Sequence, residues 1–376
     1  MTSDCDRRGH QRVPGGNATT VGVVDETASI APVLEVTRLS ISYRSSDGDV
    51  RAVEEVSFSL APGEVLGLAG ESGSGKSTLA YGACRLLRPP ALITAGSVIY
   101  RGRRVGPSGV EILEQSTHEL RRLRWREIAI VFQSAMNALN PVLRVRDQII
   151  DALKAHLELS GEEMRDRAGD LFDLVGIPRD RLRSYPHELS GGMRQRVMIA
   201  MALAVDPEVI IMDEPTTALD VVVQREILGQ VIELKERLGF SILFITHDLS
   251  LLLELADRIA IMYAGRLVEV GDAASVHKHP QHPYTEGLLR SFPSLRGPRR
   301  ELAGIPGSPP DLRYLSSGCP FAPRCTYARD ACLEIDMQLR QVAGPGEAPH
   351  SSACPFSVGR LAAGSSEVGN TAGVVL

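Results

Sequence analysis

The sequence has no long apolar segment. Its longest apolar run, Val197 to Val205, has nine residues, whereas a membrane-spanning helix needs roughly 18. The first twenty residues include basic side chains, but no apolar stretch follows them, so they do not resemble a secretory signal. We therefore expect a cytosolic protein that reaches a membrane only through a partner.

A basic surplus and an internal repeat are also missing. The 376 residues carry 41 Lys and Arg against 46 Asp and Glu, a net charge of −5, whereas nucleic-acid-binding domains usually have a strong basic excess. We therefore expect no nucleic-acid partner. Hydrophobic residues make up 43% of the chain, which is enough to bury the core of one large or two modest domains. The absence of a repeat predicts one catalytic unit.

The distribution of apolar residues predicts five segments. Residues 1–31 lack apolar periodicity and predict a disordered arm. Residues 32–272 alternate short β-type runs with helical segments, which predicts an α/β domain with a mostly parallel sheet. Within it, residues from about 134 to 200 predict a helical subdomain. Residues 273–358 are rich in proline and cysteine and predict a small C-terminal extension, and residues 359–376 predict a flexible tail.

Residues 70–77 fit the phosphate-binding pattern G-x-x-x-x-G-K-[ST]. They follow a predicted buried strand and open a helix, as the mechanism of a P-loop requires. The glycines let backbone N–H groups turn toward phosphates, and the helix N-terminus adds its positive dipole end. Lys76 would reach the β- and γ-phosphates, and Ser77 would hold Mg²⁺. The predicted nucleotide-binding residues here are Gly70, Ser72, Gly73, Ser74, Gly75, Lys76, Ser77 and Thr78.

A second predicted buried strand, residues 208–214, ends in two carboxylates. In a P-loop ATPase, the acid at the end of such a strand helps to hold Mg²⁺, and this role falls to Asp213. Glu214 is then placed to polarise the attacking water as a general base. An apolar run ending in Asp-Glu is weak evidence alone, but it becomes strong when it follows a P-loop.

Residues 189–196, LSGGMRQR, resemble the signature of ABC ATPases. A Ser-Gly-Gly turn before a helix is more often only a helix N-terminus, but here it lies one helix before Asp213. In the family, this turn binds the γ-phosphate of ATP held by the opposing subunit, which is anion binding at a helix N-terminus. The resemblance implies this role for Ser190, Gly191 and Gly192.

The remaining ABC motifs follow in the family's order. Gln133 resembles the Q-loop glutamine, residues 217–220 resemble the D-loop, and His247 resembles the switch histidine that contacts the γ-phosphate. Tyr43 lies where the family stacks an aromatic ring on adenine. The resemblance implies catalytic roles for Glu214, His247 and Gln133, a Mg²⁺ site formed by Ser77, Gln133 and Asp213, and nucleotide contacts from Tyr43 and Asp220.

Further segments narrow the resemblance to the ATPase subunits of oligopeptide, dipeptide and nickel importers. Residues 70–77, 137–141 (NALNP) and 219–228 (LDVVVQREIL) look like theirs. His282-Pro-Tyr-Thr matches the segment that opens their C-terminal extension, and residues 318–332 continue the likeness. Ser134-Ala135 departs from a common Asp-Pro, and Asp336-Met337 lies where a proline is usual.

That resemblance implies a P-loop ABC ATPase with an antiparallel β subdomain, which hydrolyses ATP with Mg²⁺ to power uptake of peptides or, as the alternative, of nickel or another solute. It implies integral membrane permease subunits, a second ABC ATPase subunit and, indirectly, an extracytoplasmic solute-binding protein. The second ATPase would be a related chain more readily than a copy. The protein would be peripheral, at the cytoplasmic face of the inner membrane.

Soluble ABC ATPases of translation or DNA repair fit less well, since they generally carry two ATPase units or a long coiled-coil insertion. A redox or metal sensor would not need the hydrolytic residues.

Four of the six cysteines lie near the C-terminus. In a cytosolic protein, such a group indicates metal or redox chemistry more than disulfides. The spacing C-x5-C-x6-C-x21-C lacks the tight pairs of zinc sites and favours an iron–sulfur cluster, most simply [4Fe–4S]; the family resemblance implies the same, with zinc or free thiols as alternatives. The hydrolytic motifs all precede residue 272, so we expect ATP binding to be independent of this group. The four predicted ligands are Cys319, Cys325, Cys332 and Cys354.

Overall fold

The structure is a computed structural model that describes residues 31–133, 138–216, 219–291, 304–315, 317–342 and 348–356. The predicted tail at 359–376 and, apart from Ala31, the predicted arm at 1–31 lie outside these ranges. Within the described part of the chain, no helix combines the length and the apolar character needed to cross a membrane.

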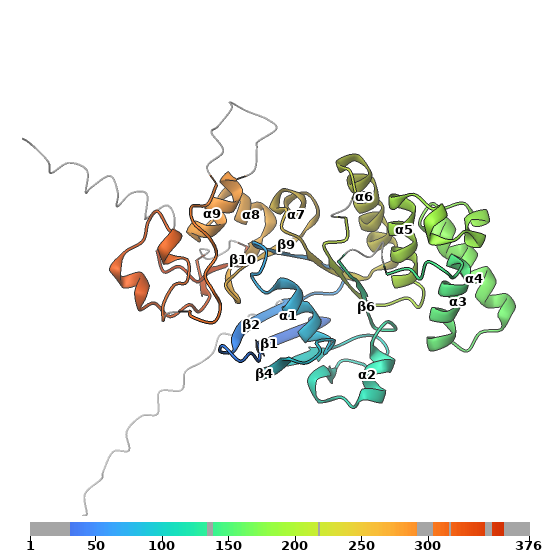
Figure 1. Cartoon of the computed structure of the whole chain (residues 1–376), viewed down its shortest axis with the longest axis horizontal. Coiled ribbons are helices and arrows are strands. Elements are labelled where there is room, and N and C mark those ends of the chain that lie inside the picture. Colours follow the sequence, from blue (N-terminus) through green and yellow to red (C-terminus); the bar gives the residue numbers. More distant parts are fainter. Residues whose placement is uncertain are drawn as a thin grey trace, which may run out of the picture. The chain divides into compact units, whose positions relative to one another are not determined.

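Two sheets organise the described residues (Figure 1). The larger has the strand order β11-β12-β10-β9-β3-β8-β7-β6, and its β9, β3, β8, β7 and β6 run parallel. Three of these strands are buried at every position, as expected where both faces of a parallel sheet are covered. The parallel strands are β3 (Val65–Ala69), β6 (Ile128–Val131), β7 (Val209–Asp213), β8 (Ser241–Ile245) and β9 (Arg258–Tyr263).

The two faces of the parallel sheet contribute side chains to two different hydrophobic clusters, because successive side chains of a strand point to opposite faces. Along β7, Ile210 and Met212 join one cluster and Val209 and Ile211 join the other. The second cluster also contains α1 and the smaller sheet, which is antiparallel in the order β2-β1-β4-β5. Its strands are β1 (Leu34–Tyr43), β2 (Val50–Leu60), β4 (Ala91–Tyr100) and β5 (Val110–Glu111).

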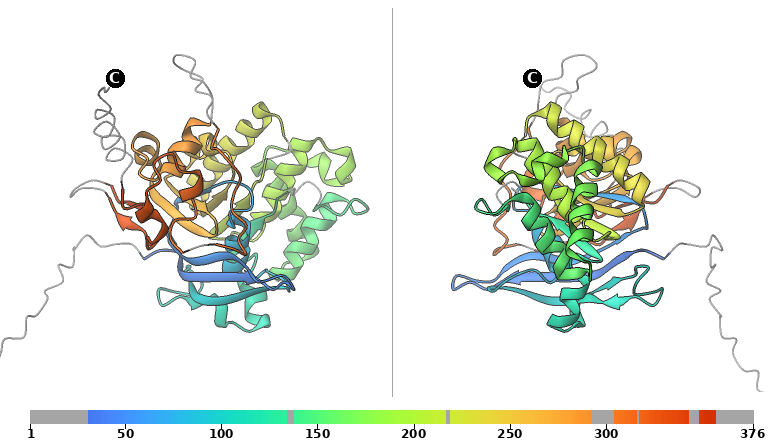
Figure 2. Two further views of the ribbon diagram at one scale, coloured as in Figure 1. Left: turned by 60° about the vertical axis from the view of Figure 1, so that its left-hand side comes forward. Right: turned by 90° about the vertical axis from the view of Figure 1, so that its right-hand side faces the viewer.

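Helices cover the face of the parallel sheet that contributes to the other cluster (Figure 2). Some begin at clear sequence signals: Ser160 and Glu163 form a reciprocal capping box at the start of α4, which satisfies two orphan N–H groups. The α-helices are α1 (Lys76–Ala83), α2 (Thr117–Leu123), α3 (Val145–His156), α4 (Gly161–Leu174), α5 (Gly191–Ala202), α6 (Val221–Leu238), α7 (Leu249–Leu255), α8 (Ala273–Lys278) and α9 (Pro283–Arg290).

The C-terminal extension shares the larger sheet. Strand β10 (Arg266–Asp272) pairs with β9 on one side and with β12 (His350–Ser352) on the other, and β12 pairs with β11 (Arg340–Gln341). The carboxylate of Glu269, which is fully buried, accepts hydrogen bonds from the backbone N–H of His282 and lies 2.7 Å from Nε2 of His350. The predicted boundary near 272 therefore falls at the end of a strand that pairs with the extension.

Candidate nucleotide-binding and hydrolysis site

The P-loop connects the end of β3 to the start of α1. Two of its glycines are required by close approach: a Cβ on Gly70 would lie 2.2 Å from the carbonyl oxygen of Met262, and one on Gly75 would lie 2.2 Å from that of Ala52. Both residues also have positive φ angles, 150° and 102°, which side chains rarely tolerate. The loop is thus held against the strands behind it, while Ser72 remains exposed on its outer side.

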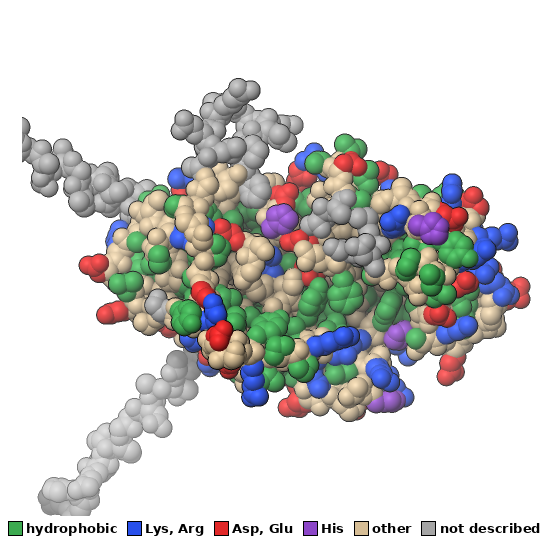
Figure 3. Space-filling model, in the orientation of Figure 1, with side chains coloured by type: hydrophobic (Ala, Val, Ile, Leu, Met, Phe, Trp, Pro, Cys, Tyr) green, Lys and Arg blue, Asp and Glu red, His purple; other side chains and the backbone are tan. Residues whose placement is uncertain are grey.

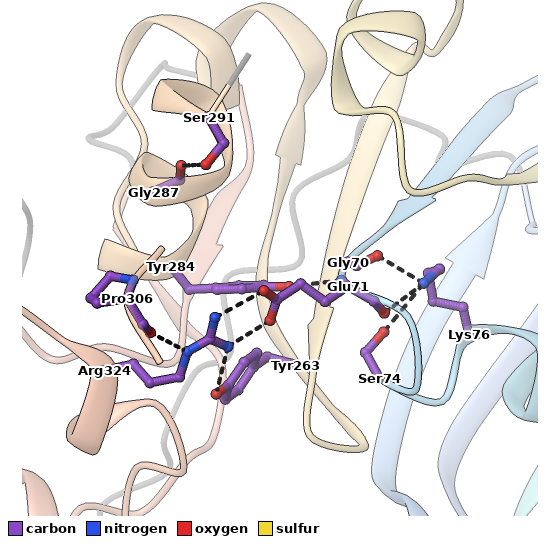
Figure 4. A network of polar contacts seen from close by, with 10 residues as sticks. All are labelled: Gly70, Glu71, Ser74, Lys76, Tyr263, Tyr284, Gly287, Ser291, Pro306 and Arg324. Carbon is purple, nitrogen blue, oxygen red and sulfur yellow. Dashed lines mark hydrogen bonds and ion pairs between the residues drawn. The ribbon is translucent and has the colours of Figure 1, made fainter. Parts of the chain in front are cut away.

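Lys76 is buried and folded back on the loop. Its Nζ donates to the carbonyl oxygens of Gly70, at 2.8 Å, and Glu71, at 2.9 Å (Figure 4). Burial lowers the pKa of its ammonium group, and the carboxylates of Glu214, Asp213 and Glu71 oppose that effect. The ammonium group therefore contacts two neutral carbonyl oxygens, next to the place where the negatively charged phosphates of ATP would bind.

Asp213 lies at the end of β7 and is fully buried. Its Oδ1 accepts a 3.0 Å hydrogen bond from Ser77, and its Oδ2 accepts a 2.6 Å bond from the hydroxyl of Tyr81. A serine hydroxyl beside one carboxylate fits Mg²⁺, which usually binds one or two protein oxygens together with phosphates and water. Tyr81 was not predicted from the sequence, although its position four residues after Ser77 places both on one face of α1.

The three predicted catalytic residues meet at the carboxyl edge of the parallel sheet, where ligands bind in open α/β sheets. Oε2 of Glu214 accepts a 2.9 Å hydrogen bond from Nε2 of Gln133, and Oε1 lies 3.0 Å from Nδ1 of His247. Glu214 has a φ of 45°, which is uncommon for a side-chain-bearing residue, and its N–H donates to the carbonyl of Ile245 at 2.9 Å. The backbone and both carboxylate oxygens are therefore fixed.

Tyr43 lies beside the P-loop helix. Its hydroxyl is 3.1 Å from Oγ1 of Thr78, the residue after Ser77, and its side chain is half-buried. This contact brings the predicted adenine-stacking residue next to the predicted phosphate site, and the stacking itself stays a prediction.

The signature turn is an exposed helix start. Ser190 caps α5 by accepting a 3.2 Å hydrogen bond from the N–H of Met193. Gly192 faces α6, because a Cβ there would lie 2.9 Å from Cγ1 of Val223. Asp220 caps α6 through the N–H groups of its first turn, whereas Thr217 and Ala218 of the predicted D-loop lie outside the described residues.

The four C-terminal cysteines line one small cavity together with aromatic side chains that include Phe321 and Tyr327. Burial raises the pKa of Cys319 to about 11 and that of Cys354 to about 12. Among the described residues, no group of three or more His, Cys, Asp and Glu side chains is arranged to hold a metal ion. The cluster favoured by the cysteine spacing therefore stays a prediction.

Because these polar groups converge on one phosphate-binding loop at the carboxyl edge of a parallel sheet, the fold and the site define a P-loop ATPase. Residues 53–217 match the ABC transporter family, and residues 268–332 match the C-terminal region of oligopeptide/dipeptide transporters. The chain belongs to the ABC transporter family, and its sequence-based assignment to that family and to the α/β class is confirmed. It is an ATPase, which uses ATP and Mg²⁺, and its partners are permease subunits and a second ATPase.

Individual relatives align over most of the chain. The oligopeptide transport ATP-binding protein OppD of Salmonella typhimurium is 44% identical over 316 residues, which cover 82% of this chain and 92% of OppD. OppD of Escherichia coli is 45% identical over 302 residues, which cover 80% and 87%. Among solved structures, cbiO1 from Clostridium perfringens, part of an ABC transporter complex, is 28% identical with a TM-score of 0.55 over 65% of this chain and 90% of cbiO1.

Proposed function

We propose that this protein powers the import of dipeptides or oligopeptides. The observation that carries the proposal is the match of residues 268–332 to the C-terminal region of oligopeptide/dipeptide transporters, a segment beyond the motifs that any ABC ATPase needs. We infer that the protein lies peripherally at the cytoplasmic face of the inner membrane, bound to permease subunits. A solute-binding protein outside the membrane would supply the peptide.

The proposed mechanism begins with the phosphates of ATP. The P-loop N–H groups and Lys76 would bind the β- and γ-phosphates, while Ser77, Asp213 and Gln133 would hold Mg²⁺, which supplies charge neutralisation. Lys76 would leave its two carbonyl partners for the phosphates, which are stronger acceptors because they are charged. Tyr43 would stack on the adenine.

Hydrolysis would then depend on the Glu214 carboxylate. Gln133 and His247 hold its two oxygens, so the carboxylate is oriented before water binds, which is the preorganisation that makes a general base effective. Ser190, Gly191, Gly192 and Asp220 would serve the ATP held by the P-loop of the second ATPase. Each site would therefore need both subunits.

Transport in a defined system tests the proposal. Tagged protein should co-purify with integral membrane subunits. In lipid vesicles with the ATPase facing outward and the solute-binding protein inside, added ATP should drive movement of a labelled tripeptide from the lumen to the outside, which is the ATPase side. The same complex with Lys76→Ala should move none. If the complex moved Ni²⁺ and no tripeptide, nickel and not peptide would be the substrate. A chain that binds no membrane subunit would overturn the transport function.

We also propose that an iron–sulfur cluster on the four cysteines stabilises the extension, residues 273–358. The extension follows the core at 32–272, whose helical part lies at about 134–200, and β12 joins the two in one sheet. Support comes from the convergence of all four side chains on one cavity. Cysteines bind such a cluster as thiolates, and cluster binding would contribute folding free energy to the segment.

Protein prepared without air should therefore be brown and contain about four iron atoms per chain with equal acid-labile sulfide. Cys325→Ser should lose the colour and make the extension sensitive to protease. Cys84→Ala is the matched control, because Cys84 is buried in the core away from this cavity, and it should stay brown. Stoichiometric zinc without iron would contradict the cluster but keep a structural metal.

A further inference from the structure

An ion pair joins the C-terminal extension to the P-loop. Arg324 lies at the end of a short 3₁₀ helix, Ala322–Arg324, between two of the cysteines. Its Nη1 donates to Oε2 of Glu71 at 2.6 Å, and its Nη2 donates to Oε1 at 2.9 Å (Figure 4). The Arg324 side chain is only 6% exposed. The Glu71 side chain is partly exposed. A two-pronged contact from a buried guanidinium group fixes the orientation of both partners, unlike the exposed ion pairs that dominate protein surfaces.

The arginine is itself held on its far side. Its Nε donates to the carbonyl oxygen of Pro306 at 2.8 Å, and its Nη1 also lies 3.3 Å from the hydroxyl of Tyr263, the last residue of β9. The guanidinium group therefore has partners from the extension, from the sheet and from the P-loop. A side chain anchored in this way has little freedom to follow movements of Glu71, so the P-loop residue must conform to it.

The backbone of Glu71 is also held by hydrogen bonds. Its N–H donates to the hydroxyl of Tyr284 in α9 at 2.8 Å, and its carbonyl oxygen accepts from Nζ of Lys76 at 2.9 Å. One P-loop residue thus connects Arg324 and Tyr284 of the extension to the lysine that would bind phosphate. In addition, Pro309, Pro310 and Leu312 share a small cavity with the outer residues of the loop.

We propose that Arg324 is a positioning residue for ATP binding. It holds the Glu71 carboxylate away from the phosphates and compensates its charge, and it fixes the carbonyl on which Lys76 rests. Without Arg324, a carboxylate in the P-loop would be left unpaired near a ligand that carries several negative charges, and like charges repel more strongly at a partly buried position than in bulk water. Part of the ATP site is then built by the extension, whatever solute the transporter carries.

Purified full-length protein with Arg324→Met tests the proposal through binding of a non-hydrolysable ATP analogue and through the kinetics of hydrolysis in the assembled complex. We expect the analogue to bind about tenfold more weakly, the loss typical of one charge-assisted contact, and KM for ATP to rise in parallel. The kcat at saturating ATP should fall by less than about threefold, because the hydrolytic residues are untouched. Arg324→Lys should be intermediate, since an ammonium group cannot make the two-pronged contact.

A double variant separates positioning from simple stabilisation. Because the harm comes from an unpaired Glu71 charge, Glu71→Gln combined with Arg324→Met should bind the analogue more tightly than Arg324→Met alone. Arg313→Met is the matched control: it breaks an ion pair with Asp311 in the same extension and should leave ATP binding unchanged. Unchanged affinity in Arg324→Met, or a double variant weaker than Arg324→Met, would overturn the proposal. If Arg324→Met fails to fold, Arg324→Lys and its combination with Glu71→Gln supply the same comparison.

Discussion

Replacement of Glu214 by glutamine should leave ATP binding intact and reduce hydrolysis by a hundredfold or more, on the order of the 10²–10⁴ that general base catalysis contributes. The amide has nearly the same shape, and its oxygen can still accept the hydrogen bond that Nε2 of Gln133 donates. It cannot accept a proton from water, however. Turnover of the assembled complex and binding of a non-hydrolysable ATP analogue are the two measurements, and only turnover should change.

Glu254→Gln is the matched control for this change. Glu254 is an exposed glutamate paired with Arg225 on the surface, so the same chemical substitution there removes only a contact of small value. Both measurements should match the unchanged protein. Hydrolysis within about threefold of normal in Glu214→Gln would show that another group activates the water, since general base catalysis would then contribute far less than usual.

Ser190→Arg should abolish nearly all hydrolysis at the site whose P-loop belongs to the second ATPase. Ser190 begins α5 and is exposed, and the first N–H groups of a helix have no partners within it. A long cationic side chain would fill the space before those groups and displace the γ-phosphate of the partner's ATP. Loss of a single donor to a developing negative charge already costs about 10²–10³ in rate. The assay is hydrolysis by the complete transporter.

The control for Ser190→Arg removes a helix cap at a position outside the nucleotide site that the two ATPases share. Ser160 caps α4 through the N–H of Glu163, so Ser160→Arg should cost a similar amount of stability, about 1 kcal/mol, and retain hydrolysis. The arrangement also predicts that the isolated chain hydrolyses ATP poorly at low concentration. A monomer with full activity that does not change with concentration would contradict the assignment of Ser190 to the partner's site.

The distribution of charged side chains on the surface does not mark the nucleotide-binding site (Figure 3). Acidic and basic side chains are interspersed over this face of the molecule, in keeping with a net charge of −5 spread over 41 cationic and 46 anionic side chains. Many pairings of those charges are compatible with the sequence. Only the folded chain selects Glu71 as the partner of Arg324, 253 residues away.

What the sequence determined by itself was local chemistry. The P-loop places its glycines, Lys76 and Ser77 within eight residues, so the strand, the turn and the helix start follow from backbone conformations that neighbouring residues impose. The two carboxylates at the end of β7 were predicted from the apolar strand that they close and from the P-loop before it, whereas Gln133 and His247 were assigned through the resemblance to ABC ATPases. Those short-range rules indicated a P-loop ATPase, and the resemblance of residues 189–196 to the ABC signature narrowed this to an ABC ATPase.

The tertiary structure decided how distant segments meet. It pairs β12 with β10, places Tyr284 and Arg324 against Glu71, and adds Tyr81 to the Asp213 site. The order of motifs predicted that ATP binding is independent of the extension, whereas these contacts lead us to expect that Cys325→Ser, next to Arg324, weakens it. No local pattern contains this information, since such contacts arise only when the packing of the whole core brings the segments together. The sequence therefore specified the candidate catalytic groups, and long-range packing determined which residues hold them.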